Sequence, residues 1–302
     1  MLLSIHTYSA LLSLSMSLAT CGPHDGAVPT VGDAEYEYDL SKPDKQLRLP
    51  GRLKEISGLT VVDGHLLAAI QDEKGEIYLI DPTDGDVVDE FKFEKKGDYE
   101  GIELVDDTLY VLRSDGDLFV VSDWRSKDRK TEKIETYLAS KNDTEGLGYQ
   151  ASKHRLLVAA KEFPGRGRSR VRSIYGFDLQ TKKIDHEPAY VIPLDTIGVR
   201  LGLPGESIRN LLAPVVDLEV FKPSALAVHP QTGDIFVLSS VLKVIAVLDA
   251  SGSTLRLLPI GAEELVQPEG LAFYPNGDLF ISTEGRGGDG KILRFNQRNA
   301  AE

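Results

Sequence analysis

The chain has 302 residues, of which 41% are hydrophobic and 27% charged, and this balance excludes a largely disordered protein. Its 34 basic and 47 acidic residues give a net charge of −13, which repels nucleic acid and anionic membrane surfaces and favours cations as partners. The single cysteine excludes an intramolecular disulfide, so the fold depends on its own core or on a metal.

The first predicted element is an apolar segment at residues 2–20, LLSIHTYSALLSLSMSLAT, which ends in small residues directly before Cys21. It is too short and too interrupted by Ser and Thr for a membrane-spanning helix, and it resembles a bacterial lipoprotein signal. We therefore expect residues 1–20 to be a signal peptide, Cys21 to be lipidated, and residues 21–34 to be a flexible tether to the cell envelope. A plain secretory signal and a non-cleaved anchor are the alternatives.

The rest of the chain repeats one pattern five times. Each copy has a small residue, a short apolar run, a turn rich in Asp, Gly, Pro or Asn, and a second apolar run. The small residues stand at positions 58, 101, 146, 225 and 270, so most copies are 43 to 45 residues apart and one interval spans 79. This period is typical of one blade of a β-propeller.

Four strands per copy match a four-stranded antiparallel blade. In the first copy we expect strands near 55–62, 66–71, 76–81 and 87–93. The last copy lacks its fourth strand, which residues 34–50 can supply, so that the two chain ends close the ring without an exposed edge. We predict an all-β, five-bladed propeller over residues 35–297 and a disordered tail at 298–302. A six-bladed ring is the alternative, if the 79-residue interval hides another blade.

Two of these copies, KPSALAVHPQTGDIFVLSS and PEGLAFYPNGDLFIS, together with the lipoprotein-like leader, resemble the SdiA-regulated (YjiK-like) family of bacterial envelope proteins, distantly similar to NHL-type propellers. The resemblance implies a five-bladed propeller that binds calcium in a structural site and has no established enzymatic activity. It therefore implies a non-catalytic scaffold that binds a ligand or a protein.

The residue before each small residue is Ser57, Glu100, Glu145, Ser224 or Glu269. Because the first strand of each blade lines the central channel, these five side chains are predicted to lie at one depth, with the three carboxylates facing one another. At ~6 Å and an effective dielectric of about 20, each pair repels by roughly 3 kcal/mol. A positive charge is therefore expected among them.

Two kinds of neutraliser compete for this role. The internal one is a pair of cations, Arg113 beside Glu100 and Lys161 beside Glu145. The external one is Ca²⁺, a hard cation that takes about six to eight oxygen ligands. The residues alone leave both open, and the family resemblance favours calcium. The predicted ligands come from two tiers of the channel: Glu100, Glu145, Glu269, Glu284, Glu162 and Asp72.

Other chemistry has weaker support in the sequence. The six histidines show no zinc-binding spacing, and no Gly-x-Ser-x-Gly or Ser-x-x-Lys motif supplies a nucleophile. A calcium-dependent hydrolase of lactonase, esterase or phytase type is the alternative function, and RGRSRVR at 166–172 is its only candidate phosphate cluster. A protein partner at the envelope is a third interpretation, with contacts at residues 198–214 and at Trp124, which packing between blades explains equally well. We expect a monomer.

Overall fold

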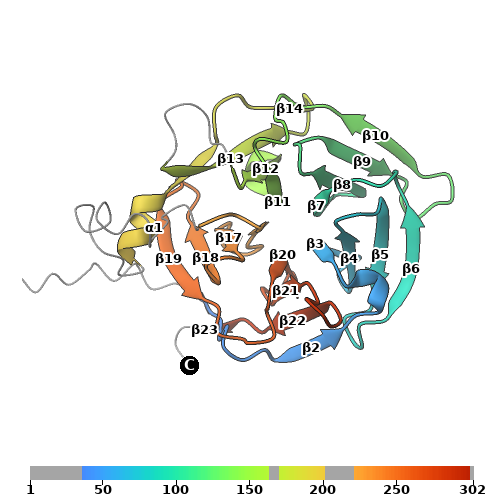
Figure 1. The fold of residues 1–302 in the computed structure, drawn as a ribbon. Coiled ribbons are helices and arrows are strands. Elements are labelled where there is room, and N and C mark those ends of the chain that lie inside the picture. The colour runs from blue at the N-terminus through green and yellow to red at the C-terminus, as the bar shows by residue number, and fades with distance from the viewer. Residues whose placement is uncertain (1–35, 163–169, 201–220, 300–302) are drawn as a thin grey trace, which may run out of the picture. The chain divides into compact units, whose positions relative to one another are not determined.

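A computed structural model of the chain describes residues 36–162, 170–200 and 221–299. Five antiparallel sheets stand around a central axis in these residues (Figure 1). The sheets form a five-bladed β-propeller, which confirms the predicted fold class and excludes the six-bladed alternative.

The first two blades follow the predicted pattern closely. Blade 1 contains β3 (Ile56–Val62), β4 (Leu66–Gln71), β5 (Glu76–Ile80) and β6 (Val87–Lys92). Blade 2 contains β7 (Tyr99–Val105), β8 (Thr108–Arg113), β9 (Leu118–Ser122) and β10 (Lys130–Ile134). Each blade 1 strand begins and ends within one residue of its predicted bounds.

Blades 3 and 4 flank the long interval between repeats. Blade 3 contains β11 (Thr144–Gln150), β12 (Arg155–Ala160) and β13 (Val171–Asp178), whose outer edge pairs with both β14 (Lys183–Ile184) and β15 (Tyr190–Pro193). Blade 4 contains β16 (Ala225–Val228), β17 (Ile235–Ser239), β18 (Val244–Leu248) and β19 (Thr254–Pro259). The long interval therefore carries a divided outer strand in its described part.

The fifth blade closes the ring with both ends of the chain. It contains β20 (Pro268–Phe273), β21 (Leu279–Thr283) and β22 (Lys291–Phe295), and its outer strand is β2 (Lys45–Arg48). Strand β2 pairs antiparallel with β22 from Lys45 opposite Arg294 to Arg48 opposite Lys291. The predicted closure by an N-terminal strand is thus confirmed. In addition, β23 (Arg298–Asn299) pairs with β1 (Tyr36–Glu37), so part of the expected disordered tail forms a strand instead.

The core consists of five apolar layers, one between each pair of neighbouring blades. The layers explain why small residues begin the innermost strands. A Cβ added to Gly101 would lie 2.6 Å from the Cβ of Leu147, and one added to Gly146 would lie 2.8 Å from the Cβ of Leu226. Such contacts are too close for two carbon atoms, so the innermost strands reach this packing only with small residues at these positions.

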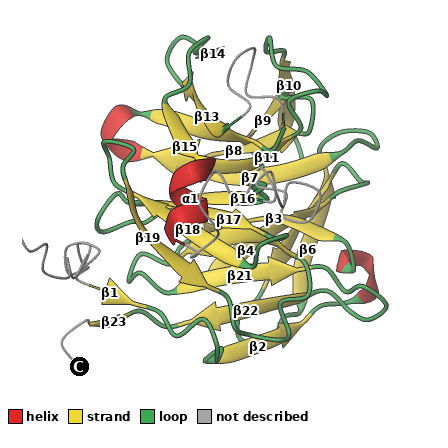
Figure 2. Cartoon of the chain, turned by 60° about the vertical axis from the view of Figure 1, so that its left-hand side comes forward, coloured by secondary structure: helices red, strands yellow, loops and turns green. Residues whose placement is uncertain are grey.

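Little helix accompanies the sheets. The described helices are two 3₁₀ turns, η1 (Gly51–Leu53) and η2 (Ala151–Lys153), and the seven-residue α1 (Leu194–Arg200) beside β15 and β19 at the rim (Figure 2). None of the helices in the described ranges is long and apolar enough to cross a membrane. Residues 1–35 and 201–220, which include the expected leader and most of the expected 198–214 contact, lie outside the described residues.

Trp124 lies in the apolar layer between blades 1 and 2. Only 1% of its surface is exposed, and its ring stacks on that of Phe91 with centroids 6.3 Å apart. Packing between blades therefore accounts for this residue, and its side chain is not presented to a partner.

Candidate functional site

The three predicted channel glutamates share one backbone feature. The pairing of each innermost strand with the next shifts register between Tyr99 and Gly101, between Thr144 and Gly146, and between Pro268 and Gly270. Glu100, Glu145 and Glu269 are the residues skipped by these shifts. A β-bulge leaves its extra residue outside the regular ladder and re-aims its side chain, as is common near functional sites.

The same three glutamates border one small cavity at the centre of the ring. The cavity has a volume of about 10 Å³, and all five innermost strands contribute to its wall. One apolar residue from each blade lines it at equivalent positions: Leu59, Ile102, Leu147, Leu226 and Leu271. The structure therefore brings Glu100, Glu145 and Glu269 together around one cavity. The five apolar residues, called the apolar ring below, lie beside them.

Burial and mutual repulsion oppose the ionisation of these carboxyls. Burial, followed by the nearby Glu145, raises the pKa of Glu100 to about 10. Burial and then Glu145 raise the pKa of Glu269 to about 8. Burial also raises the pKa of Glu145 to about 7, although Lys161 acts in the opposite direction. The surroundings therefore do not stabilise three negative charges here, and without a further cation these carboxyls retain protons at neutral pH.

Only one of the two predicted internal neutralisers takes its expected place. The Nζ atom of Lys161 contacts Oε1 of Glu145 and lies 3.5 Å from Oδ2 of Asp143, which confirms that pair. Arg113 instead binds the carboxylates of Asp115 and Asp117, each at 2.7 Å, so its predicted pairing with Glu100 is wrong. The two aspartates follow Arg113 in the tight β8–β9 turn and reach its guanidinium first. Within the described residues, no ion pair involves Glu100 or Glu269.

The serines at the two equivalent positions have a structural role. Ser57 donates a hydrogen bond to the carbonyl oxygen of Tyr99 at 2.8 Å, and Ser224 donates one to that of Pro268 at 3.1 Å. Each bond joins one blade to the next. The repeat therefore uses this position in two ways: a hydroxyl that links blades, or a carboxyl that faces the channel.

The second tier of predicted ligands divides into two places. Burial, followed by Glu55 and Glu73, raises the pKa of Asp72 to about 6, and its buried Oδ1 has no hydrogen-bond partner. Burial and then Asp72 raise the pKa of Glu284, so these two acids lie near each other. Glu162 forms an ion pair with Lys222 instead. Cys21 lies outside the described residues.

A wider cavity of about 400 Å³ opens over Glu145 and Glu269 at this end of the channel. Four cations line it: Lys161, Lys222, Lys243 and Arg286. Lys243 donates to the carbonyl oxygens of Leu265 and Val266, and Arg286 donates to the side chain of Gln267. Sequence reasoning missed Lys222, Lys243 and Arg286, because they stand in loops outside the repeated strand positions.

Comparison with known proteins places the chain in a family. The model of the SdiA-regulated family matches residues 31–195, more than half of the chain. The chain belongs to the SdiA-regulated family. This confirms the family predicted from the repeat units. No curated protein matches the sequence.

Solved structures show what this SdiA-regulated propeller resembles in fold. Glutaminyl cyclase from Myxococcus xanthus superposes with a TM-score of 0.56 at 13% identity, covering 85% of this chain and 96% of that protein. A PQQ-bound aldose sugar dehydrogenase from Streptomyces coelicolor gives a TM-score of 0.52 at 11% identity, covering 88% and 99%. At such low identities the likeness concerns the fold alone.

The fit of calcium to the SdiA-regulated propeller depends on the three bulge glutamates. Across the described residues, no three carboxylate, histidine or cysteine side chains converge into a ready-made metal cluster. One oxygen of Glu145 contacts Lys161 instead. The donors nevertheless suit a hard cation in kind, because all three are carboxyls partly or fully removed from water, and two of them have no cation partner among the described residues. The residues that would hold Ca²⁺ are Glu100, Glu145 and Glu269.

Proposed function

We propose that this protein is a non-catalytic envelope scaffold whose propeller binds Ca²⁺ through Glu100, Glu145 and Glu269. The observation that carries the proposal is that three carboxyls, whose ionisation is opposed by burial and by one another, border one small cavity. Among the described residues, Lys161 is the only cation in direct contact with any of them. A divalent ion supplies the missing positive charge, lowers the pKa of each carboxyl, and joins three blades at the axis of the ring.

The test is calcium titration calorimetry on chelator-stripped protein, combined with thermal unfolding in chelator and in calcium. We expect saturable binding and a rise in melting temperature, because a ligand that binds only the folded state stabilises it by mass action. Glu145→Gln and Glu269→Gln each remove a charged ligand and are expected to weaken binding strongly.

The matched control for these variants is Glu103→Gln. Glu103 lies on the same strand as Glu100 and also has its pKa raised by burial, but it does not border the small cavity. We expect this variant to bind calcium as the unmodified protein does. Absence of heat and of any melting shift in the unmodified protein, or equal loss in all three variants, would contradict the proposal.

The attachment to the envelope forms a separate part of the proposal. It is supported by the apolar leader that ends at Cys21 and by the polar stretch that follows. We expect the cellular protein to partition into detergent-rich phase, and Cys21→Ala to move it to the aqueous phase while the calcium response stays the same. Detergent partitioning that is unaffected by this substitution would indicate a non-cleaved anchor instead.

A further inference from the structure

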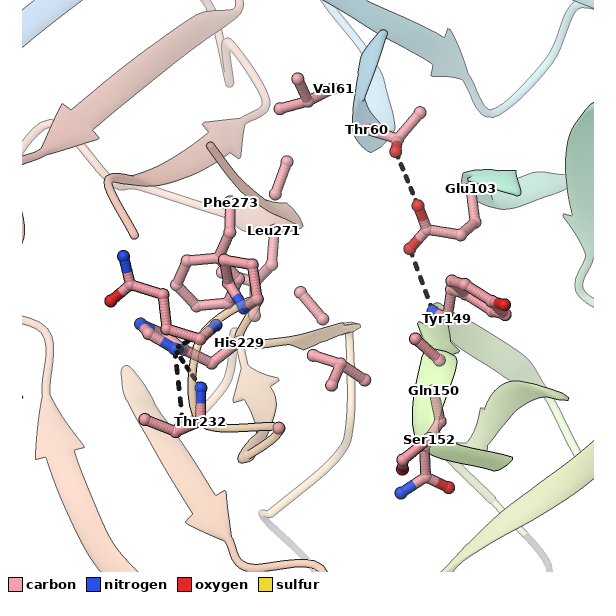
Figure 3. A pocket seen from close by; sticks show the side chains of 17 residues that line it. Thr60, Val61, Glu103, Tyr149, Gln150, Ser152, His229, Thr232, Leu271 and Phe273 are labelled. Atoms are coloured by element: carbon pink, nitrogen blue, oxygen red, sulfur yellow. Dashed lines mark hydrogen bonds between the residues drawn. The ribbon is translucent and has the colours of Figure 1, made fainter. Parts of the chain in front are cut away.

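A third cavity, larger than the two described above, lies at the opposite ends of the innermost strands. Its volume is about 510 Å³, within the range of small-molecule sites, and every blade contributes to its wall (Figure 3). On the three strands that carry a bulge glutamate, the residue of the apolar ring stands between this glutamate and the cavity, and Leu271 lines this cavity as well as the small central one. The channel therefore has two chemically independent ends.

Glu103 on β7 provides the charge of this cavity. Its Oε1 accepts hydrogen bonds from Oγ1 of Thr60 at 2.8 Å and from its neighbour's backbone N–H, that of Leu104, at 3.0 Å. Its Oε2 accepts one from the backbone N–H of Tyr149 at 3.2 Å. These donors come from blades 1, 2 and 3 and hold the carboxylate in one orientation. Oε2 keeps a lone pair for a further donor.

No lysine or arginine of the described residues forms an ion pair with this carboxylate. Among the residues that line the cavity, Glu103 is the only Asp, Glu, Lys or Arg, and it forms no ion pair with any described residue. Burial raises the pKa of Glu103 to about 7, although the three hydrogen bonds act in the opposite direction. A donor with positive charge in the cavity would therefore find a fixed, partly desolvated acceptor without a competitor.

The wall opposite Glu103 has an apolar part. Figure 3 shows Leu271 and Phe273 across the cavity from Glu103, with His229 and Thr232 on the same side. His229 adds no charge there, since burial lowers its pKa and its Nδ1 lies 3.3 Å from the backbone N–H of Thr232 as acceptor. The cavity therefore presents one acidic group that faces the apolar side chains of Leu271 and Phe273.

From this arrangement we infer that the Glu103 cavity binds a small organic cation, with an ammonium group at Oε2 of Glu103 and an apolar body against Leu271 and Phe273. The volume accommodates a body of one or two rings, and the opposed walls separate its charged and apolar ends. An anion of the same shape meets repulsion at Glu103. A neutral analogue loses the charge-assisted hydrogen bond but keeps the apolar contact.

The experiment compares three probes that differ only at one end: 2-phenylethylammonium, 2-phenylethanol and 3-phenylpropanoate. Each is titrated into the full chain at pH 8 in chelator, and the dissociation constant is measured by NMR. We expect the ammonium to bind about tenfold more tightly than the alcohol, and the carboxylate to bind most weakly. Equal affinities for all three, or no saturable binding of the ammonium, overturn the inference.

Two variants of this cavity and one of the opposite end locate the binding. Glu103→Gln keeps the size of the side chain and is expected to abolish the preference for the ammonium over the alcohol. Ser152→Trp changes an exposed residue at the cavity wall and is expected to weaken all three probes without disturbing the core. Glu269→Gln is the control and leaves the affinities unchanged. The inference is overturned if Glu269→Gln loses the preference for the ammonium over the alcohol and Glu103→Gln keeps it. It is also overturned if Ser152→Trp binds the three probes as tightly as the unmodified chain does.

Discussion

The two ends of the propeller channel bury carboxyl groups of the same kind in opposite ways. At one end, Glu100, Glu145 and Glu269 crowd around a small cavity with one lysine among them. At the other end, Glu103 stands alone and accepts three hydrogen bonds from three blades. The fold thus offsets part of the burial cost of Glu103 with its own hydrogen-bond donors, and it provides the other three carboxyls with a single lysine contact among the described residues.

Strand β7 shows how so small a change in position produces this difference. Glu103 pairs in register with Tyr110 on β8, so it keeps its place in the ladder and its side chain reaches donors on both neighbouring blades. Glu100, three residues earlier, is skipped by the register shift between Tyr99 and Gly101. The bulge frees its side chain from the ladder and aims it at other carboxyls. Whether a glutamate of β7 stands in the regular ladder or in the bulge therefore determines whether its carboxyl meets hydrogen-bond donors of the fold or other carboxyls.

The largest expected effect comes from removing an uncompensated carboxyl. Because the pKa of Glu269 is raised to about 8 in the folded state, at pH 8 the group must either take up a proton or ionise against repulsion, and either costs stability. We expect Glu269→Gln to raise the free energy of unfolding by about 3 kcal/mol at pH 8 in chelator. Urea denaturation measures this change.

The opposite end supplies the contrast for Glu269→Gln. Glu103→Gln replaces an acceptor of the Tyr149 N–H, so it is expected to give no gain of this size at pH 8. If both variants stabilise the protein equally, or if Glu269→Gln destabilises it in chelator, the two ends are compensated alike and the comparison fails.

The fold was predictable because its determinants are local and repeated. Small residues at 58, 101, 146, 225 and 270 allow the innermost strands to pack closely, and the turn residues between strands set the blade period. The missing strand of the last blade also followed from counting strands. The divided outer strand of blade 3 and the β1–β23 pair were not predicted, because two- to four-residue strands carry no recognisable alternation.

The candidate site was predictable only in part. Alignment of the repeats placed Glu100, Glu145 and Glu269 together, since equivalent positions in a propeller lie at equal depth. It failed for Arg113, whose partners Asp115 and Asp117 lie in its own turn and compete at shorter range. It also missed Glu103, which follows Glu100 in the run EGIE and has no acidic equivalent in the other blades. Which carboxylate an arginine or lysine pairs with depends on how far its side chain extends and on which acids lie nearby, and the repeat pattern does not specify either.

An intermediate effect is expected from removing the one cation among the three glutamates. Lys161→Met leaves the buried Glu145 without its partner, which costs less than a fixed buried charge would because Glu145 can take up a proton. We expect the free energy of unfolding to fall by about 2 kcal/mol at pH 8 in chelator, measured by urea denaturation, and calcium to restore part of the loss.

Lys222→Met is the matched control for this lysine. Lys222 pairs with Glu162, and 34% and 37% of the two side chains are exposed, so water screens the pair and its loss should change stability by less than about 1 kcal/mol. Equal effects of the two substitutions would show that Glu145 is no more dependent on its lysine than a surface carboxylate is.

The smallest expected effect is a difference in pH dependence at the Glu103 end. The pKa of Glu103 is about 7 in the folded state against an ordinary value of 4.5, so between these values the folded protein binds more protons than the unfolded one. Stability contributed by this group therefore falls as pH rises from about 4.5 to 7. Glu103→Gln removes this share of the decline. The stability of the variant minus that of the unmodified protein should increase by on the order of 1 kcal/mol per pH unit between pH 5 and pH 7.

The difference curve isolates Glu103 because Glu100, Glu145 and Glu269 titrate in both proteins and cancel. The same curve for Glu269→Gln should continue to rise up to about pH 8, since the pKa of Glu269 is raised to about 8 by burial and by Glu145. The pH at which each curve levels off therefore reports how well the fold compensates that carboxyl. The Glu103→Gln curve could instead level off at the same pH as the Glu269→Gln curve, or at a higher pH. The ionised form of Glu103, with its three hydrogen bonds, would then be no more stable than that of Glu269, which is repelled by its neighbours. In that case the distinction between the regular and the bulged position on the innermost strands would have no energetic basis.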